Sequence, residues 1–118
     1  MTSINNDKNN NDKNNNDNNN NKNSIIISDA DIITNGSFDK YNLIQNINEI
    51  GIIMNKDNTQ ISEITPLFMI LNQNSNDCQN KVNTMVNLGA DLNMKINYFG
   101  KNTSAIDIIN QYRKHIHV

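Results

Sequence analysis

The sequence predicts an all-α fold, a short solenoid of stacked helix–loop–helix repeats with extended turns between the repeats. Two observations predict it. A helix–loop–helix unit runs from Thr65 to Asn93, with a helix start signal at its beginning and a helix stop signal at its end. Landmarks of this unit recur at a spacing of about 38 residues, since Gly51 precedes Gly89 and Thr65 precedes Ser104 at nearly that interval. Repeated landmarks are typical of stacked repeats.

Length and charge limit the possible functions. The chain has 118 residues, enough for one small domain. Its formal net charge is −2, so its charge does not indicate nucleic acid or an anionic membrane surface as a partner. No apolar run approaches the roughly 20 residues of a membrane helix, and the N-terminus lacks the apolar centre of a signal peptide. With one cysteine and hence no internal disulfide, we expect an intracellular protein, cytoplasmic in the first place, with the nucleus as the alternative.

Residues 1–23 are a low-complexity segment, in which 13 residues are asparagine and the charges of aspartates and lysines cancel. Such a segment has too little apolar surface to offset the entropy of ordering a backbone, so we predict that it is disordered. A+T-rich codons favour asparagine, so the bias need not reflect function. Self-association through asparagine ladders is the functional alternative. The folded domain is then expected to span residues 24–118.

The first predicted repeat covers about residues 24–55. Ile25–Ile27 is a short β-branched run, and Ser28 could cap a helical turn after it; periodicity does not decide between strand and helix here. A helix is predicted from Phe38 to Ile50, because its apolar residues fall on one helical face. These residues are Leu43, Ile44, Ile47 and Ile50. Gly51 is expected to end this helix in the left-handed conformation.

The central repeat covers about residues 56–93 and contains the best-defined helix signals. A polar turn at 56–59 leads into a short extended stretch that reaches Thr65. The Thr65 hydroxyl can accept an amide bond of the first helical turn, and Pro66 fits the first helical position. Two short apolar faces follow, separated by a polar loop at 72–80. Their residues are Leu67, Ile70 and Leu71, then Val82, Met85 and Val86. Gly89 is the stop signal.

The last, partial repeat covers about residues 94–118. It begins with a turn that carries Tyr98, Phe99 and Gly100 at its tip. Thr103 or Ser104 then opens a helix. The buried side of this helix is predicted to consist of Ile106, Ile109 and Tyr112.

The central unit resembles the ankyrin repeat. Thr65-Pro66-Leu67 matches the start of that family's Thr-Pro-Leu-His opening, and the run from Gly89 through Ala90 and Asp91 to Asn93 matches its Gly-Ala-Asp-x-Asn exit. The chain departs from the family at Phe68, where histidine is usual, and its turns are longer. The resemblance covers about residues 24–113 and is strongest over 65–93. It implies a non-catalytic module that binds a partner protein through turn tips and inner helices, with no cofactor.

The predicted partner-binding residues follow from this placement. Asn97, Tyr98 and Phe99 lie in an elongated turn, where exposed aromatic rings would anchor a partner. The alternative is that both rings pack on the neighbouring repeat. Phe68 either contacts a partner from the inner helix or fills the space between inner helices.

No residue pattern predicts catalysis or a metal site. His115 and His117 lack further ligands nearby in sequence, and Cys78 lacks a base that would activate it. The chain offers roughly two and a half repeats, while about three are usually needed, so we expect marginal stability or completion by a second copy or a partner. Two other functions remain open: a fragment or decayed end of a longer repeat protein with no independent function, and a small metal-binding or enzymatic helical protein.

Overall fold

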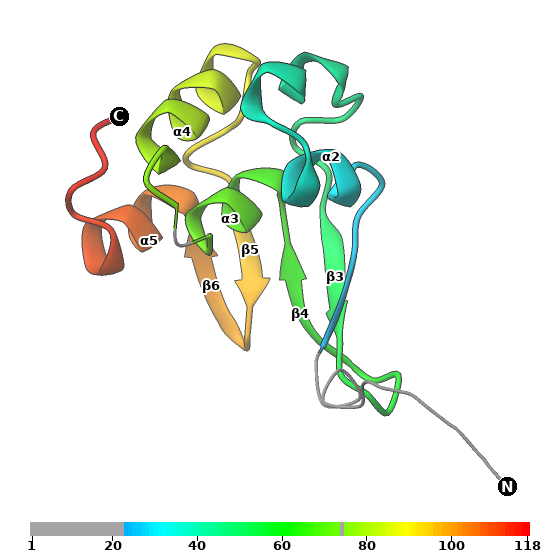
Figure 1. Ribbon diagram of the computed structural model, residues 1–118. Coiled ribbons are helices and arrows are strands. Elements are labelled where there is room, and N and C mark those ends of the chain that lie inside the picture. Colours follow the sequence, from blue (N-terminus) through cyan, green and yellow to red (C-terminus); the bar gives the residue numbers. More distant parts are fainter. Residues whose placement is uncertain (1–22, 74) are drawn as a thin grey trace, which may run out of the picture.

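The computed structural model describes residues 23–73 and 75–118 (Figure 1). This part of the chain is a mixed α/β fold, with a three-stranded and a two-stranded antiparallel sheet beside short helices. The prediction of an all-α solenoid is therefore wrong. The segments predicted as extended turns pair as the two hairpins β3–β4 and β5–β6, each closed by a turn that contains left-handed residues. The prediction of disorder for residues 1–23 lies outside the described residues, apart from Asn23.

The larger sheet has the strand order β2-β3-β4, with β2 (Ser24–Ile26), β3 (Gly51–Met54) and β4 (Gln60–Ile64) all antiparallel to their neighbours. The ambiguous isoleucine run at 25–27 is thus mainly a strand. The polar turn predicted at 56–59 is confirmed as the β3–β4 loop, as is the extended stretch before Thr65. The Asn55 side-chain oxygen accepts bonds from two backbone amides of this loop, and Asn58 takes its left-handed position with φ 64°.

Gly51 begins β3 and does not end a helix, so its predicted role as a helix stop is wrong. Its φ is not in the left-handed region. Glycine is needed here for another reason: a Cβ would lie 2.4 Å from the Ile26 carbonyl oxygen and 2.9 Å from the Ile27 Cβ. The backbone of β2 approaches β3 too closely for any side chain at this position.

The helix predicted over Phe38–Ile50 is also wrong. The structure has α2 (Ala30–Asn35), a 3-10 helix η2 (Phe38–Leu43) and then irregular chain. Leu43 and Ile50 are 58% and 50% exposed, so they do not form a buried face. Side-chain bonds hold this segment in another conformation: Asp29 accepts the amide of Gln45, which a helix would use, and the Asn48 side chain bonds to the backbone of residues 89 and 91.

The N-terminus of α2 also differs from the prediction. Asp29, not Ser28, holds the N-cap position, and its side chain makes no capping bond. Both the backbone amide and the hydroxyl of Ser28 donate to the Glu49 carboxylate instead. The contact ties the end of β2 to the segment that precedes β3.

The central helices follow the sequence signals closely. In α3 (Pro66–Leu71) the Thr65 hydroxyl accepts the Phe68 amide at 3.3 Å, as predicted, and all six helical residues are buried. The next helix, α4 (Cys78–Asn87), begins inside the stretch predicted as a loop. Gly89 ends it with φ +100°. Its amide donates to Val86 and that of Ala90 donates to Met85, which is the Schellman arrangement.

The second hairpin joins β5 (Lys95–Tyr98) to β6 (Lys101–Ser104) through a two-residue turn. Ser104 then caps α5 (Ala105–Tyr112) in a capping box with Asp107. The buried residues of α5 are Ala105, Ile108 and Ile109. The predicted buried side was correct for Ile109, and Ile106 is half-buried. It was wrong for Tyr112, which is 72% exposed although it lies on the same helical face as Ile108 and Ile109, at the end of the helix.

The helices gather at one end of the two hairpins, which project from them in the same direction (Figure 1). After α5 the chain returns to α4, where the Gln79 side chain donates to the His117 carbonyl at 2.7 Å and accepts the His117 amide at 2.8 Å. Ile116, which precedes His117, is buried in the core. The C-terminal residues thus pack against α4.

Candidate functional site

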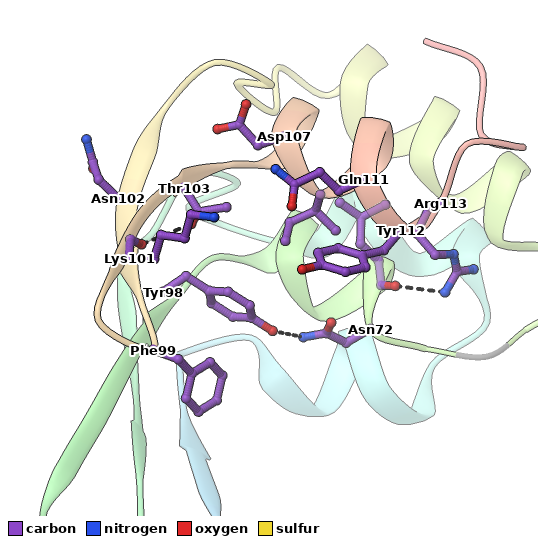
Figure 2. A pocket seen from close by; sticks show the side chains of 12 residues that line it. Asn72, Tyr98, Phe99, Lys101, Asn102, Thr103, Asp107, Gln111, Tyr112 and Arg113 are labelled. Atoms are coloured by element: carbon purple, nitrogen blue, oxygen red, sulfur yellow. Dashed lines mark hydrogen bonds between the residues drawn. The ribbon is translucent and has the colours of Figure 1, made fainter.

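A groove of about 520 Å³ lies between the second hairpin, the end of α3 and α5 (Figure 2). Leu71 and Ile108 are the aliphatic residues of its lining, and both are largely buried. Tyr98 and Lys101 border it from the hairpin, and Tyr112 borders it from α5. The groove therefore combines an apolar base with aromatic and cationic borders, which is the usual composition of a site that holds another molecule.

Tyr98 is part of the framework of the groove. Its ring lies 5.1 Å from that of Phe68, centroid to centroid, and its hydroxyl oxygen accepts a bond of 2.7 Å from the Asn72 side chain (Figure 2). The bond joins the hairpin to the end of α3. Phe68 is only 2% exposed, so it fills the space between the hairpin and the helices.

Phe99 stands at the tip of the hairpin and is 52% exposed. It has a left-handed backbone with φ 49°, and Gly100 follows with φ 85°, which makes a type I′ turn. Left-handed backbone costs an ordinary residue roughly 1–2 kcal/mol. Asparagine, which tolerates this conformation well, takes the left-handed position of the first hairpin at Asn58. The ring of Phe99 makes an edge contact with Tyr98 at 4.9 Å.

Two side chains of β4 hold β5 in place. The Asn97 amide donates to the Glu63 carboxylate at 2.7 Å, and the Phe99 amide donates to the Ser62 hydroxyl at 2.9 Å. These bonds occupy positions where a continuous sheet would have backbone carbonyls. These two bonds form what we call the junction between β4 and β5. The backbone amide of Asn97 takes part in it, whereas the Asn97 residue is otherwise exposed.

Arg113 connects α5 to the end of α3. Its guanidinium donates to the carbonyl oxygen of Leu71 at 2.9 Å (Figure 2) and to that of Gln73 at 3.3 Å, where a cation complements the negative end of a helix. Its Nε is buried and has no hydrogen-bond partner among the described residues. The side chain thus joins α5 to the end of α3 at the border of the groove.

One carboxylate lies at the groove, and it is already paired. Asp107 accepts the Ser104 amide at 3.0 Å and the Lys95 ammonium at 3.2 Å. The Ser104 amide, with Lys95 second, lowers the pKa of Asp107 below its ordinary value of 3.8. Lys101, in contrast, has no ion pair with any residue of the described ranges.

The structure brings the predicted site residues together unequally. Tyr98 and Phe99 both lie at the groove. Tyr98 packs inward, as the packing alternative expected for both rings, whereas Phe99 stays exposed. Phe68 takes the space-filling role. Three further residues of the groove, Lys101, Tyr112 and Arg113, were missed. Their signal was weak: Lys101 follows a turn glycine, Tyr112 was predicted to be buried, and Arg113 follows the last residue of α5.

The histidines at the C-terminus and Cys78 do not form a site in the described part of the chain. His115 and His117 are exposed, and Cys78 is buried with its thiol near the Ile70 carbonyl. Residues 23–73 and 75–118 hold no group of three or more histidine, cysteine or acidic side chains that could bind a metal. Within the same ranges, no helix has the length and apolar character needed to cross a membrane.

No family model matches the chain, and neither a curated protein nor a solved structure matches it. The likeness to ankyrin repeats stays a prediction from the sequence.

Proposed function

We propose that this chain is a non-catalytic protein-interaction module, which binds a segment of a partner protein in the groove between the second hairpin and α5. The observation that carries the proposal is Phe99. A large aromatic side chain stands at an exposed turn tip, on the border of a groove, in a backbone conformation that does not suit it. Backbone strain at an exposed residue is characteristic of functional positions.

Composition strengthens the argument from Phe99. The chain contains 29 asparagines, and asparagine is the residue that fits a left-handed turn position best after glycine. The first hairpin has asparagine there. The second hairpin keeps phenylalanine, although its ring is half exposed and gains little from packing. Binding to a partner would explain why phenylalanine stands at this position, whereas packing within the fold does not.

The neighbouring side chains support the same function. Tyr112 is 72% exposed and, like Phe99, borders the groove. Aromatic residues are enriched among those that dominate binding energy at interfaces. Here a hairpin tip and the first helix after each hairpin, α3 and α5, surround the groove.

The test is partner capture by the full chain and by a double variant, Phe99→Asn with Tyr112→Ala. Asparagine suits the left-handed turn and alanine suits a helix, so the variant should keep the melting temperature of the parent. We expect its affinity for the captured protein to fall by about 30-fold or more.

The matched control is Leu43→Ala, which removes a 58% exposed apolar side chain that does not line the groove. It should capture the same protein as the parent chain does. Equal capture by the double variant would show that the groove is not part of the binding site.

A further inference from the structure

We propose that the groove selects an acidic segment of its partner, in which a carboxylate lies beside an aromatic or aliphatic side chain. This inference rests on the proposed function and adds the chemistry of the partner. It follows from the charges that the groove leaves uncompensated and from the apolar surface next to them.

The charges at the groove are unequal. Lys101 forms no ion pair with the described residues, and Arg113 bonds to carbonyl oxygens, so its charge meets dipoles and no carboxylate. Asp107 is the acidic residue of the lining, and Lys95 neutralises it at 3.2 Å. The groove therefore presents positive charge on a chain whose formal net charge is −2. A negatively charged segment would be drawn to this surface and repelled from most others.

The apolar surface lies directly beside this charge. Figure 2 shows the side chains of Lys101, Tyr98 and Tyr112 pointing into the groove, whereas Asn102 points away from it. The base includes Leu71 and Ile108. A side chain that packs on Tyr112 would thus place its neighbours in the segment close to the Lys101 ammonium. An acidic residue next to an aromatic or aliphatic one satisfies both contacts.

Single-stranded nucleic acid is the competing anionic partner, since it also combines negative charge with flat apolar rings. Proteins that bind it follow the phosphate backbone with a groove of many cations. This groove offers Lys101 and Arg113, and Arg113 already holds the end of α3. The negative net charge of the chain also opposes a polyanion. An acidic peptide, which needs one or two cations, fits the site better.

The first experiment is selection of phage-displayed random peptides of about seven residues, which extend over about 23 Å, on the immobilised full chain. We expect the selected peptides to be enriched in aspartate or glutamate next to an aromatic or aliphatic residue. Selected peptides that are neutral or basic would overturn the acidic preference and leave the proposed function standing. If no peptide binds, while the capture experiment also finds no partner, the proposed function itself fails.

The second experiment measures the affinity of one selected acidic peptide for charge-reversal variants. Lys101→Glu should weaken binding about ten-fold, and high salt should reduce the remaining difference. Lys114→Glu is the matched control, since this exposed lysine follows α5 outside the groove lining, and it should bind as the parent does. Equal losses in both variants, or tighter binding of a thymidine oligonucleotide than of the peptide, would refute the proposal.

Discussion

The two hairpin–helix units of this fold are built alike and buried differently. In the first, β3, β4 and α3 follow one another; in the second, β5, β6 and α5 do. Thr65 and Ser104 cap the two helices at the same place, each by accepting the amide three residues later. Yet all six residues of α3 are buried, whereas α5 is buried on one side only and ends at the exposed Tyr112.

The difference lies in what each helix has for neighbours. The position three residues after the cap is the buried Phe68 in the first unit and the paired Asp107 in the second. The first helix is short and needs its neighbours for stability, because six residues are too few for a helix alone. The second is stabilised locally by its capping box and leaves one side free. The same start signal thus begins one fully buried helix and one helix that is buried on one side only.

The largest expected effect is that of Phe68→Ala. Removing this buried ring leaves a cavity beside Tyr98, so the free energy of unfolding should fall by about 3–5 kcal/mol in urea titrations. Tyr112→Ala in the second unit should change it by less than about 0.5 kcal/mol. Similar losses for both variants would mean that the second unit is buried as thoroughly as the first.

Alanine substitutions of Gly51 and Gly100 test the effects of steric crowding and of backbone strain separately. Gly51→Ala places a Cβ against the Ile26 carbonyl, so we expect a loss of about 2–3 kcal/mol. An alanine Cβ at residue 100 meets nothing within 4 Å, and only the φ of +85° opposes it, for a loss of about 1 kcal/mol. Thermal unfolding of both variants tests this order, and a reversed order would contradict the close approach of β2.

Ser62→Ala tests the junction that joins the units. Without the hydroxyl the Phe99 amide loses its acceptor, so we expect a loss of about 1 kcal/mol and an exchange rate of that amide about five-fold higher. Hydrogen exchange followed by NMR measures it. Ser37→Ala is a control at an exposed serine outside the junction. Unchanged exchange at Phe99 would show that the junction depends on other contacts.

The smallest effect is the pH dependence at the cap of the second unit. The lowered pKa of Asp107 means that the folded state favours the carboxylate; its contribution is therefore present above the ordinary value of 3.8 and is lost as pH falls through the lower folded value. Asp107→Asn should lower the melting temperature at neutral pH, and the difference should disappear in acid. A difference independent of pH would assign the effect to hydrogen-bond geometry instead of charge.

The sequence was sufficient for the local signals and insufficient where long-range contacts decide. The caps at Thr65 and Ser104 and the stop at Gly89 depend on residues close in sequence, so they could be predicted. Gly51 could not be assigned correctly, because its role depends on the distant carbonyl of Ile26. The hairpins were read as turns, since pairing between strands is not visible in one strand alone.

The candidate site was predicted only in part, because part of it depends on local signals and part on long-range contacts. Tyr98 and Phe99 stood out because two aromatic residues precede a turn glycine in a chain poor in aromatics. The contributions of Lys101 and Arg113 depend on which helix the hairpin faces. That placement arises from the bond between Asn72 and Tyr98 and from the carbonyls at the end of α3.

The junction between β4 and β5 has a consequence for how such units combine. A backbone ladder accepts nearly any neighbouring strand, since every residue has the same amide and carbonyl. Here the acceptors are the side chains of Ser62 and Glu63, and the same positions before the second cap hold Lys101 and Asn102. The choice of neighbouring strand therefore depends on these side chains. In the second hairpin Lys101, which has no acceptor, stands at the position of Ser62, so a third hairpin could not make the same pair of bonds. Misjoined assembly along this edge is discouraged by chemistry that a single mutation could change.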